Sequence, residues 1–551
     1  MITFALSNGE TQTVAHGTPL SDVLPKTKDG LPVLAALLNN DVVPLTSPAL
    51  LNGTLKPLTL ADEDGWQVYR RTLCFLLAKV LHERFPGIQY SVRQSFGHNA
   101  LYWSWNIPEA EREVKTATLR ACLAALIEQN EPIRHCLAGY DQILSLFQSS
   151  GQVDKINLLA HRNPPYLCLA TCQGFYDLPQ GVLASRTGVI ELFDLVPLKD
   201  GFVLEFPGFH TPTVLDPMPP YNFLFDVYAE HLRWGEIIGI RNVGQLNAAI
   251  ADGSVVDVIN TVEALHEKRL ASIADAIAER QPRPHVVLIA GPSSAGKTTS
   301  AMRLCTHLRV NGLLPTLIST DNYFVGDARN PRDENGNLDY EHLDAVDRER
   351  LNADINRLLK GETIPLRKFD FFKHEGYDSS ETLTLDAKRG VLVIEGIHSL
   401  NPDLTPAIPR EEKFLIYVNV LTQLAIDSNN RISTIDNRLL RRMVRDGQFR
   451  GRSPRETLRL WPSVRAGEEK WIFPFQHYAD AVFNTALDYE IAVLKSLASP
   501  LLNQIKPSHP EFVIARRLSC FLQNFASMPM ADVPTNSILR EYLGESRLRY
   551  Q

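Results

Sequence analysis

Residues 285–300 read HVVLIAGPSSAGKTTS and decide the fold of the C-terminal half. The run HVVLIA is continuously apolar, as a fully buried parallel strand requires. Gly291–Thr298 matches the pattern G-x-x-x-x-G-K-[ST], and the residues after it have helical spacing. Loop amides and a helix N-terminus together cradle phosphates, so strand, loop and helix occur in the order that phosphate binding needs. The stretch predicts an α/β domain that binds a nucleoside triphosphate.

Two residues of this loop have specific expected roles. Lys297 is expected to reach the β- and γ-phosphate oxygens, and the hydroxyl of Thr298 to ligate Mg²⁺. The predicted nucleotide-binding residues are Gly291, Pro292, Ser293, Ser294, Ala295, Gly296, Lys297, Thr298 and Thr299.

Carboxylates follow two further apolar runs. Asp321 comes directly after LLPTLIST, and Glu395 lies at the end of the strand in GVLVIEGIH. Ligands of open α/β sheets bind at the carboxyl ends of the strands, where both side chains are therefore expected. Asp321 is predicted to act as general base near the γ-phosphate, and Glu395 to hold Mg²⁺ directly or through water. The structural alternative is that each caps a helix.

The segment 438–459 contains eight arginines and no lysine. It is interpreted either as a nucleic-acid patch or as a lid whose guanidinium groups close over a transferring phosphoryl group. A solvated helix face would not explain the exclusive use of arginine. Planar, bidentate donors suit phosphate, so the lid is favoured.

Composition limits the classes of function. The chain has 551 residues, 44% hydrophobic and 22% charged, with a net charge of −7. This length predicts several domains, and the charge predicts no general attraction to nucleic acid or anionic membranes. The sequence shows no signal peptide and no apolar run of roughly 18 residues, so the cytoplasm is expected. The seven cysteines lack a CxxC pair and are expected to be reduced thiols.

The N-terminal residues predict a small α+β module. Asn8-Gly9 lies between two alternating runs and indicates a hairpin. A helix-like SDVLP and a strand-like PVLAALLNNDVV follow. An apolar stripe of period 3.6 predicts a helix from about Trp66 that ends before Pro86. Helices are predicted over 224–280, and two more near the C-terminus, with no internal repeats.

Taken in order, the motifs over roughly 285–490 resemble the uridine kinase and phosphoribulokinase family of P-loop kinases. They are GPSSAGKT, STDNYF, YEHLDAVD, FDFFKH, IEGIH, RLLRRMVRD, FRGR and HYADAVFN. The resemblance implies ATP and Mg²⁺ as cofactors and a parallel sheet flanked by helices. It also implies that Asp321 takes the proton of the acceptor hydroxyl and that Glu395 is the acid associated with Mg²⁺.

The resemblance assigns further residues to each substrate. Arg445 and Arg450 are expected at the ATP phosphates, and Lys297, Asp321, Arg445 and Arg450 form the expected catalytic set. The residues expected to contact the acceptor are Tyr323, Glu341, Phe369, His374, Arg442 and Arg452.

Three departures bear on the acceptor. Glu341 replaces the family's aspartate, Phe369 replaces a tyrosine, and Glu375-Gly376 stands where a uridine kinase usually has a residue followed by arginine. Loss of polar groups that contact a sugar or base changes substrate choice strongly. The acceptor's identity therefore stays open.

The front half resembles threonyl-tRNA synthetases. Residues 1–62 are similar to a TGS domain, and 63–225 to the editing domain of those enzymes. At the four zinc-ligand positions of that domain this chain has Arg71, Phe75, Pro179 and Leu183, none of which ligates zinc as histidine or cysteine does. His82 and His98 are interpreted as packed or surface residues.

The expected order is then a TGS-like domain (1–62), an editing-like domain without its metal ligands (63–225), a helical connector (226–280), a P-loop kinase domain (281–505) and a C-terminal helical segment (506–551). The leading hypothesis is an ATP-dependent kinase for the 5′-hydroxyl of a nucleoside. The alternatives are an RNA- or ribosome-associated regulatory ATPase and a kinase for another small hydroxyl compound, such as a sugar phosphate. RNA binding by the front domains is less favoured, no membrane is expected, and a homo-oligomer stays open.

Overall fold

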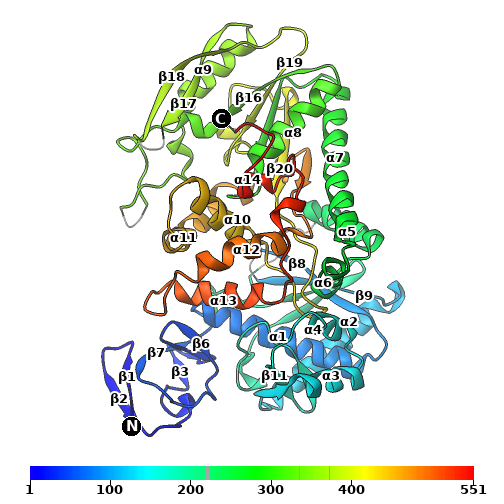
Figure 1. Ribbon diagram of the computed structural model, residues 1–551, viewed down its shortest axis with the longest axis vertical. Coiled ribbons are helices and arrows are strands. Elements are labelled where there is room, and N and C mark those ends of the chain that lie inside the picture. The colour runs from blue at the N-terminus through cyan, green and yellow to red at the C-terminus, as the bar shows by residue number, and fades with distance from the viewer. Residues whose placement is uncertain (98, 217–221, 334–335, 371–372, 551) are drawn as a thin grey trace. The chain divides into compact units, whose positions relative to one another are not determined.

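The fold is described from a computed structural model (Figure 1), which describes residues 1–97, 99–216, 222–333, 336–370 and 373–550. His98 lies outside these residues. The chain forms two compact units, each made of segments that are distant in sequence. The first unit comprises Met1–Val255, Gln423–Ile432 and Ser499–Ser527, and the second comprises Val256–Thr422, Ser433–Ala498 and Met528–Gln551.

These units group the chain differently from the five expected segments. The long helix expected in the connector 226–280 falls almost wholly in the second unit, and the expected C-terminal segment 506–551 is divided between the two. Consecutive segments do not describe these units, because packing joins parts of the chain that are far apart in sequence.

A parallel sheet forms the centre of the second unit. Its strand order is β16-β19-β15-β20-β21, and each neighbouring pair is parallel. Every residue of β15, β19 and β20 is buried, which explains their continuous apolar sequences. The strands are β15 (Val286–Ala290), β16 (Leu314–Ser319), β19 (Gly390–Glu395), β20 (Lys413–Asn419) and β21 (Ala481–Asn484).

Helices α7 and α8 cover one face of this sheet (Figure 1). Leu270 and Ile277 of α7 pack in one core with Leu304 of α8 and with Val287 and Val393 of the strands. The α/β fold predicted from the phosphate loop is thereby confirmed. The helices of the unit are α7 (Val255–Glu279), α8 (Lys297–Val310), α9 (Arg348–Leu359), α10 (Thr434–Phe449), α11 (Pro454–Trp471), α12 (Glu490–Leu502) and α14 (Arg540–Leu543).

Two smaller elements complete the surroundings of the site. The 3₁₀ helix η3 (Thr320–Tyr323) follows β16 directly. An antiparallel hairpin of β17 (Ile364–Asp370) and β18 (Glu375–Leu383) extends beyond the sheet next to α9 (Figure 1).

The first unit begins with a mixed sheet of order β2-β1-β7-β5-β6. The predicted hairpin is present, since β1 and β2 pair antiparallel around Gly9, whose φ is 85°. The run expected as one strand is a second hairpin that turns at Asn39 and Asn40, both with positive φ, a conformation that asparagine tolerates. The elements are β1 (Ile2–Leu6), β2 (Thr11–Val14), η1 (Leu20–Asp22), β3 (Thr27–Lys28), β4 (Leu31–Pro32), β5 (Ala35–Leu38), β6 (Asp41–Val43) and β7 (Gly53–Leu58).

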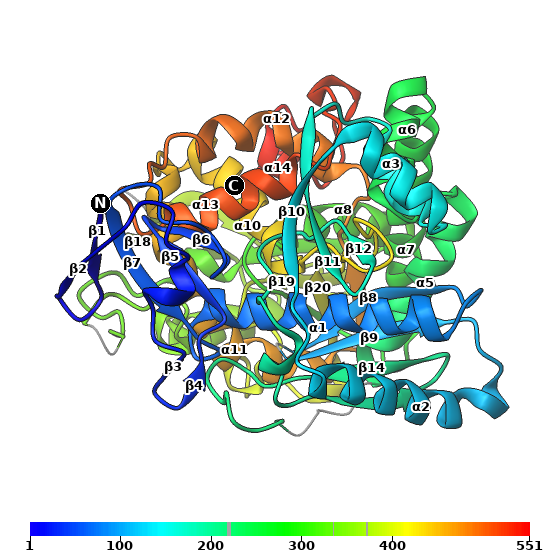
Figure 2. The same ribbon diagram turned by 90° about the horizontal axis from the view of Figure 1, so that it is seen from below.

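A larger α+β body follows it. Helix α1 (Glu63–Arg84) ends before Pro86, as its apolar stripe predicts, and lies along β8 and β9 (Figure 2). The sheets have the orders β13-β14-β9-β8 and β10-β11-β12. The remaining elements are β8 (Tyr90–Phe96), β9 (Ala100–Trp105), α2 (Glu109–Glu128), β10 (Arg134–Gly139), α3 (Tyr140–Ser149), α4 (Val153–Leu159), β11 (Tyr166–Cys172), β12 (Phe175–Asp177), β13 (Asp194–Leu198), β14 (Gly201–Glu205), α5 (Asn222–Ile238), α6 (Val243–Asp252) and α13 (Phe512–Leu522).

The four positions compared with zinc ligands come from two segments that meet. The loop after β12 lies against α1, because the Ala184 N–H donates to the Thr72 hydroxyl at 2.9 Å and Gly181 lies beside the Arg71 guanidinium. Phe75 and Leu183 are buried in one apolar cluster. Where the two segments meet, apolar side chains pack together, and the Arg71 guanidinium lies beside them.

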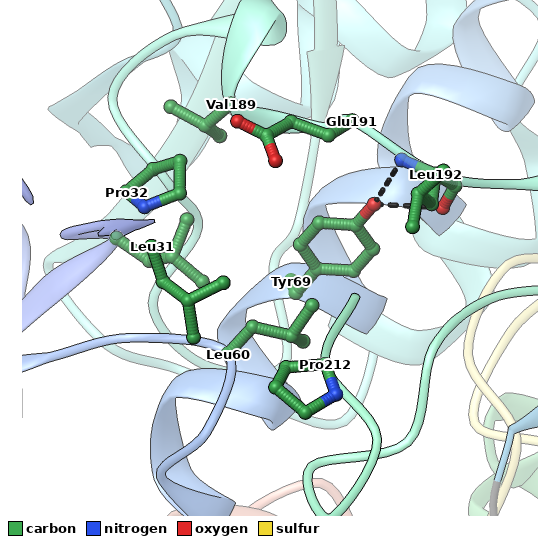
Figure 3. Close-up of a pocket in the computed structure, with 9 residues that line it drawn as sticks. Leu31, Pro32, Leu60, Tyr69, Val189, Glu191, Leu192 and Pro212 are labelled. Carbon is green, nitrogen blue, oxygen red and sulfur yellow. Dashed lines mark hydrogen bonds between the residues drawn. The ribbon is translucent and has the colours of Figure 1, made fainter. Parts of the chain in front are cut away.

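A small cavity lies between strand β4 and the α+β body, within the first unit (Figure 3). Its volume is about 10 Å³, close to the space that one buried water needs. The hydroxyl of Tyr69 points to the Leu192 backbone, donating to its carbonyl at 2.7 Å, and burial raises the pKa of Tyr69 to about 12. Among the described helices, none is both long and apolar enough to cross a membrane.

Candidate active site

The phosphate loop joins β15 to α8 in a conformation that its sequence requires. Gly296 caps α8 with a φ of 81°, a left-handed conformation that glycine adopts at little cost, and Ser294 has a φ of 58°. The ammonium group of Lys297 donates to the Pro292 carbonyl across the loop at 3.3 Å. The loop is thus closed on itself, with its lysine at the N-terminus of α8.

Glu395 and Thr298 lie together at the carboxyl edge of the sheet. The Thr298 hydroxyl donates to Glu395 Oε1 at 3.3 Å. Burial, and then the negative charge of Asp321, raise the pKa of Glu395 to about 7. A buried carboxylate beside a second acid favours a bound cation, because a cation offsets the repulsion between them.

These oxygens fit Mg²⁺. Mg²⁺ is usually held by one or two carboxylates, a hydroxyl and the phosphates of the substrate, and keeps several waters. Thr298 and Glu395 supply the protein's share of such a set. Among the described residues, here or elsewhere, there is no group of three His, Cys, Asp or Glu side chains arranged to hold a metal.

Asp321 lies in η3, two residues beyond Ser319, which pairs with Glu395 between β16 and β19. It is half-buried and close enough to raise the pKa of both Glu395 and Glu341. Tyr323 is buried, and its hydroxyl donates to Asp354 at 3.2 Å. The Tyr323 hydroxyl is therefore hydrogen-bonded to a residue of α9.

Three of the predicted arginines surround one buried carboxylate, that of Asp446. Arg442 and Arg445 each lie 3.4 Å from it and Arg450 4.0 Å. The Arg445 charge, and then burial, lower the pKa of Arg450 to about 10. Three cations with one anion leave a surplus of positive charge that phosphate would neutralise.

Two arginines of the same run have a different role. Arg438 and Arg441 are fully buried and pair with Glu468 and Glu490 at 2.5 and 2.6 Å. These two arginines hold α10 against its neighbours, and a lid role stays a prediction for the other arginines of the run.

Glu341 is half-buried and packs against Gly467 of α11, with its Oε2 atom buried. A Cβ added to Gly467 would lie 2.3 Å from the Cβ of Glu341, so the close approach requires glycine at that position. Burial and the charge of Glu468 raise the pKa of Glu341 to about 7, although Arg442 and Lys297 lower it. Arg452 is half-buried and lies within electrostatic range of Arg442.

The other residues predicted to contact the acceptor gather around the β17–β18 hairpin. The ring of Phe369 packs edge-on against Phe324 with centroids 5.7 Å apart. His374 Nδ1 lies 3.0 Å from the Tyr340 hydroxyl and 3.1 Å from Asp327. Tyr340 immediately precedes Glu341. The residues around the β17–β18 hairpin and Glu341 beside α11 therefore lie in one region of the second unit.

Sequence reasoning missed two sets of residues at this site. Glu468 accepts a hydrogen bond from the Ser293 N–H, inside the phosphate loop, at 3.0 Å. Glu541 accepts a hydrogen bond from the Thr299 hydroxyl at 2.6 Å. The Tyr550 hydroxyl lies 3.1 Å from the hydroxyl oxygen of Thr299. No local motif marks either glutamate.

Comparison with known proteins agrees with this geometry. Residues 286–492 match the model of the phosphoribulokinase/uridine kinase family. A uridine kinase of Halobacterium salinarum is 30% identical over 195 residues, which are 35% of this chain and 77% of that protein. The chain belongs to the phosphoribulokinase/uridine kinase family. A uridine kinase of Deinococcus deserti is 29% identical over 201 residues, 36% of this chain and 87% of the relative.

Membership of the phosphoribulokinase/uridine kinase family makes the chain a phosphotransferase that acts on a hydroxyl acceptor. Among solved structures, a possible uridine kinase from Bacillus stearothermophilus matches 39% of this chain and 98% of its own, with 20% identity and a TM-score of 0.27.

Proposed function

We propose that the chain is an ATP-dependent nucleoside kinase that transfers the γ-phosphate to the 5′-hydroxyl of a nucleoside. The observation that carries the proposal is the convergence of Lys297, Asp321 and Glu395 at one edge of the parallel sheet. The uridine kinases named above support the nucleoside as acceptor.

Each group has a role in the proposed transfer. Asp321 accepts the proton of the acceptor hydroxyl as the oxygen attacks phosphorus. Lys297 and the arginines around Asp446 stabilise the charge on the transferring phosphoryl group. Thr298 and Glu395 would hold Mg²⁺, which supplies further charge stabilisation when bound.

A non-nucleoside acceptor is the second candidate. It is favoured by one observation: Phe369 has no hydroxyl and that of Tyr323 is bonded to Asp354, so two aromatic residues predicted near the acceptor offer it no free hydroxyl. The TGS-like and editing-like assignments of residues 1–225 stay predictions, as do the division into five segments and the cytoplasmic location.

The test is ATP consumption by the purified chain with Mg²⁺ and a panel of nucleosides, pentose phosphates and hydroxy amino acids. The proposal expects ADP formation that depends strictly on a nucleoside and a nucleoside 5′-monophosphate as product. If the chain phosphorylates another acceptor and no nucleoside, the second candidate, a kinase for a non-nucleoside acceptor, would replace the proposal. Hydrolysis stimulated by RNA without any acceptor would indicate a regulatory ATPase instead.

A further inference from the structure

Ser293, in the phosphate loop, is held at each of its polar groups by side chains from α10 and α11. Its N–H donates to Glu468 at 3.0 Å, and its carbonyl accepts from Arg438 Nε at 3.2 Å. Its hydroxyl lies 2.6 Å from Arg442 Nη1. The geometry of the loop at Ser293 therefore depends on α10 and α11.

Glu468 is the centre of this arrangement. Its side chain is fully buried, and its two oxygens accept from the Arg438 guanidinium at 2.5 and 2.6 Å. The pair Arg441–Glu490, which joins α10 to α12, is buried to the same extent, but it reaches the phosphate loop only through Thr485, whose hydroxyl donates to the Ala295 carbonyl at 2.7 Å. Both ion pairs are thus buried, but of the two carboxylates only Glu468 accepts a hydrogen bond from the phosphate loop directly.

The same carboxylate faces the acceptor side of the site. Glu468 follows Gly467, the residue on which Glu341 packs. The charges that face Glu341 are Glu468 from α11, Arg442 from α10, Lys297 from α8 and Asp321 from η3.

Within the described part of the chain, Glu341 Oε2 is buried and accepts or donates no hydrogen bond. A buried polar atom left in this state costs free energy, so it is suited to a group that a ligand brings. After burial, the charge of Glu468 is the largest factor that raises the pKa of Glu341, which lies at about 7.

We propose that Glu468 is a positioning residue that links the two sides of the site. On the phosphate side it fixes Ser293 and Arg438. On the acceptor side its charge favours the protonated form of Glu341, so that Glu341 changes from a neutral carboxyl group to a carboxylate near neutral pH. A neutral carboxyl donates a hydrogen bond, whereas an ionised one only accepts, so recognition of the acceptor changes with pH near neutrality. The inference rests on the proposed kinase function, because it concerns the same site.

The test measures kcat and the KM for the nucleoside as functions of pH, at saturating Mg²⁺ and ATP. In the wild type the KM is expected to change as the pH passes through about 7. Glu468→Gln removes a like charge and leaves the Arg438 charge unbalanced, so the midpoint of this change is expected to fall by about one pH unit. kcat is expected to fall about tenfold, because the neutral amide holds Ser293 and Arg438 less firmly. Glu341→Gln is expected to abolish the change in KM, since it removes the group that titrates beside the acceptor, while saturating Mg²⁺ keeps Glu395 ionised.

Glu490→Gln is the matched control, because it neutralises an equally buried carboxylate that does not touch the loop. Its midpoint is expected to equal that of the wild type. If Glu468→Gln does not fold, the double variant Arg438→Gln/Glu468→Gln serves instead, because it leaves no buried charge unpaired and still removes the charge beside Glu341.

A midpoint that stays at the wild-type pH in a folded Glu468 variant overturns the inference and leaves the kinase function intact. A wild-type chain that consumes no ATP with any nucleoside overturns the proposed function, and the inference with it. The wild-type assay therefore tells the two failures apart.

Discussion

The hydroxyl of Thr299 donates a 2.6 Å hydrogen bond to the carboxylate of Glu541. Thr299 is in the first turn of α8, where the helix N-terminus favours a bound anion. Glu541 belongs to α14, which lies outside the residues 286–492 that match the family model. A segment that the family match does not include thus places a negative charge next to the phosphate loop.

The first prediction concerns this charge. Glu541→Gln keeps an oxygen that accepts from Thr299 but removes the repulsion between Glu541 and the phosphates of ATP. We expect the affinity for ATP to rise about three- to tenfold, corresponding to roughly 1 kcal/mol. Titration calorimetry without an acceptor measures it. Glu545→Gln is the control, since its side chain is 73% exposed and pairs with Arg540. Equal affinities in Glu541→Gln and the wild type would contradict the prediction.

The second prediction concerns the base. Asp321→Asn removes the proton acceptor while keeping the size of the side chain. We expect kcat to fall by about 10²- to 10⁴-fold while the dissociation constant for ATP changes little. Steady-state kinetics and an ATP titration of the same preparation measure both. Asp344→Asn, which breaks an exposed ion pair with Arg348, is the control. A kcat near that of the wild type would exclude Asp321 as the base.

Local patterns predicted the elements whose signal is contained in a few residues. The apolar run, the left-handed Gly296 and the helix after it are adjacent in sequence, so strand, loop and helix could be placed together. The hairpin at Gly9 was predicted for the same reason. The carboxyl edge of a parallel sheet then indicated where Asp321 and Glu395 would lie.

Residues whose role depends on distant partners could not be assigned in this way. Glu468 and Glu469 are adjacent, yet Glu468 is buried against Arg438, whereas Glu469 forms an exposed pair with Arg465. Within the arginine run, Arg438 differs from the arginines around Asp446 only in the partner that folding supplies. Sequence spacing carries no information on that partner.

The third prediction concerns Mg²⁺ and pH. Burial and Asp321 raise the pKa of Glu395 to about 7, so below that pH Mg²⁺ must displace a proton. The apparent affinity for Mg²⁺ is expected to rise about fivefold between about pH 6 and pH 7, by about a further twofold above pH 7, and then to level off. The Mg²⁺ dependence of kcat at each pH measures it. In Glu395→Gln the affinity should be weak at every pH. A wild-type affinity that is constant over this range would contradict the assignment of Glu395.

The fourth prediction concerns the surplus of positive charge. Arg445 lowers the pKa of Arg450 by repulsion, and Arg445 Nε is buried without a hydrogen bond among the described residues. Arg445→Met should therefore raise the thermal stability of the protein without nucleotide and weaken ATP binding by about 10- to 100-fold, as loss of a charged hydrogen bond does. Differential scanning fluorimetry with and without ATP measures both. Arg459→Met, on the exposed side of α11, should change neither. Lower stability together with unchanged ATP affinity would assign Arg445 to packing alone.

The fifth prediction concerns the first unit. The Lys155 ammonium is buried 2.6 Å from Asp177 and 3.3 Å from Asp427. Lys155→Met leaves these carboxylates buried without their cation, so we expect the free energy of unfolding to fall by about 3–5 kcal/mol near neutral pH. The loss should be smaller at about pH 5, because Asp427, whose pKa burial raises to about 6, then carries a proton and no charge.

Urea unfolding of the full chain at both pH values, monitored by a probe in the first unit, measures this loss. Lys56→Met is the matched control, because it breaks a pair with Asp62 in which the lysine side chain is 44% exposed, and such pairs contribute at most about 1 kcal/mol. If Lys155→Met costs no more than Lys56→Met, the buried cluster does not hold the segment Gln423–Ile432 in the first unit. A loss that grows as the pH falls would show that the carboxylates stay ionised without Lys155, against the sign expected from the raised pKa of Asp427.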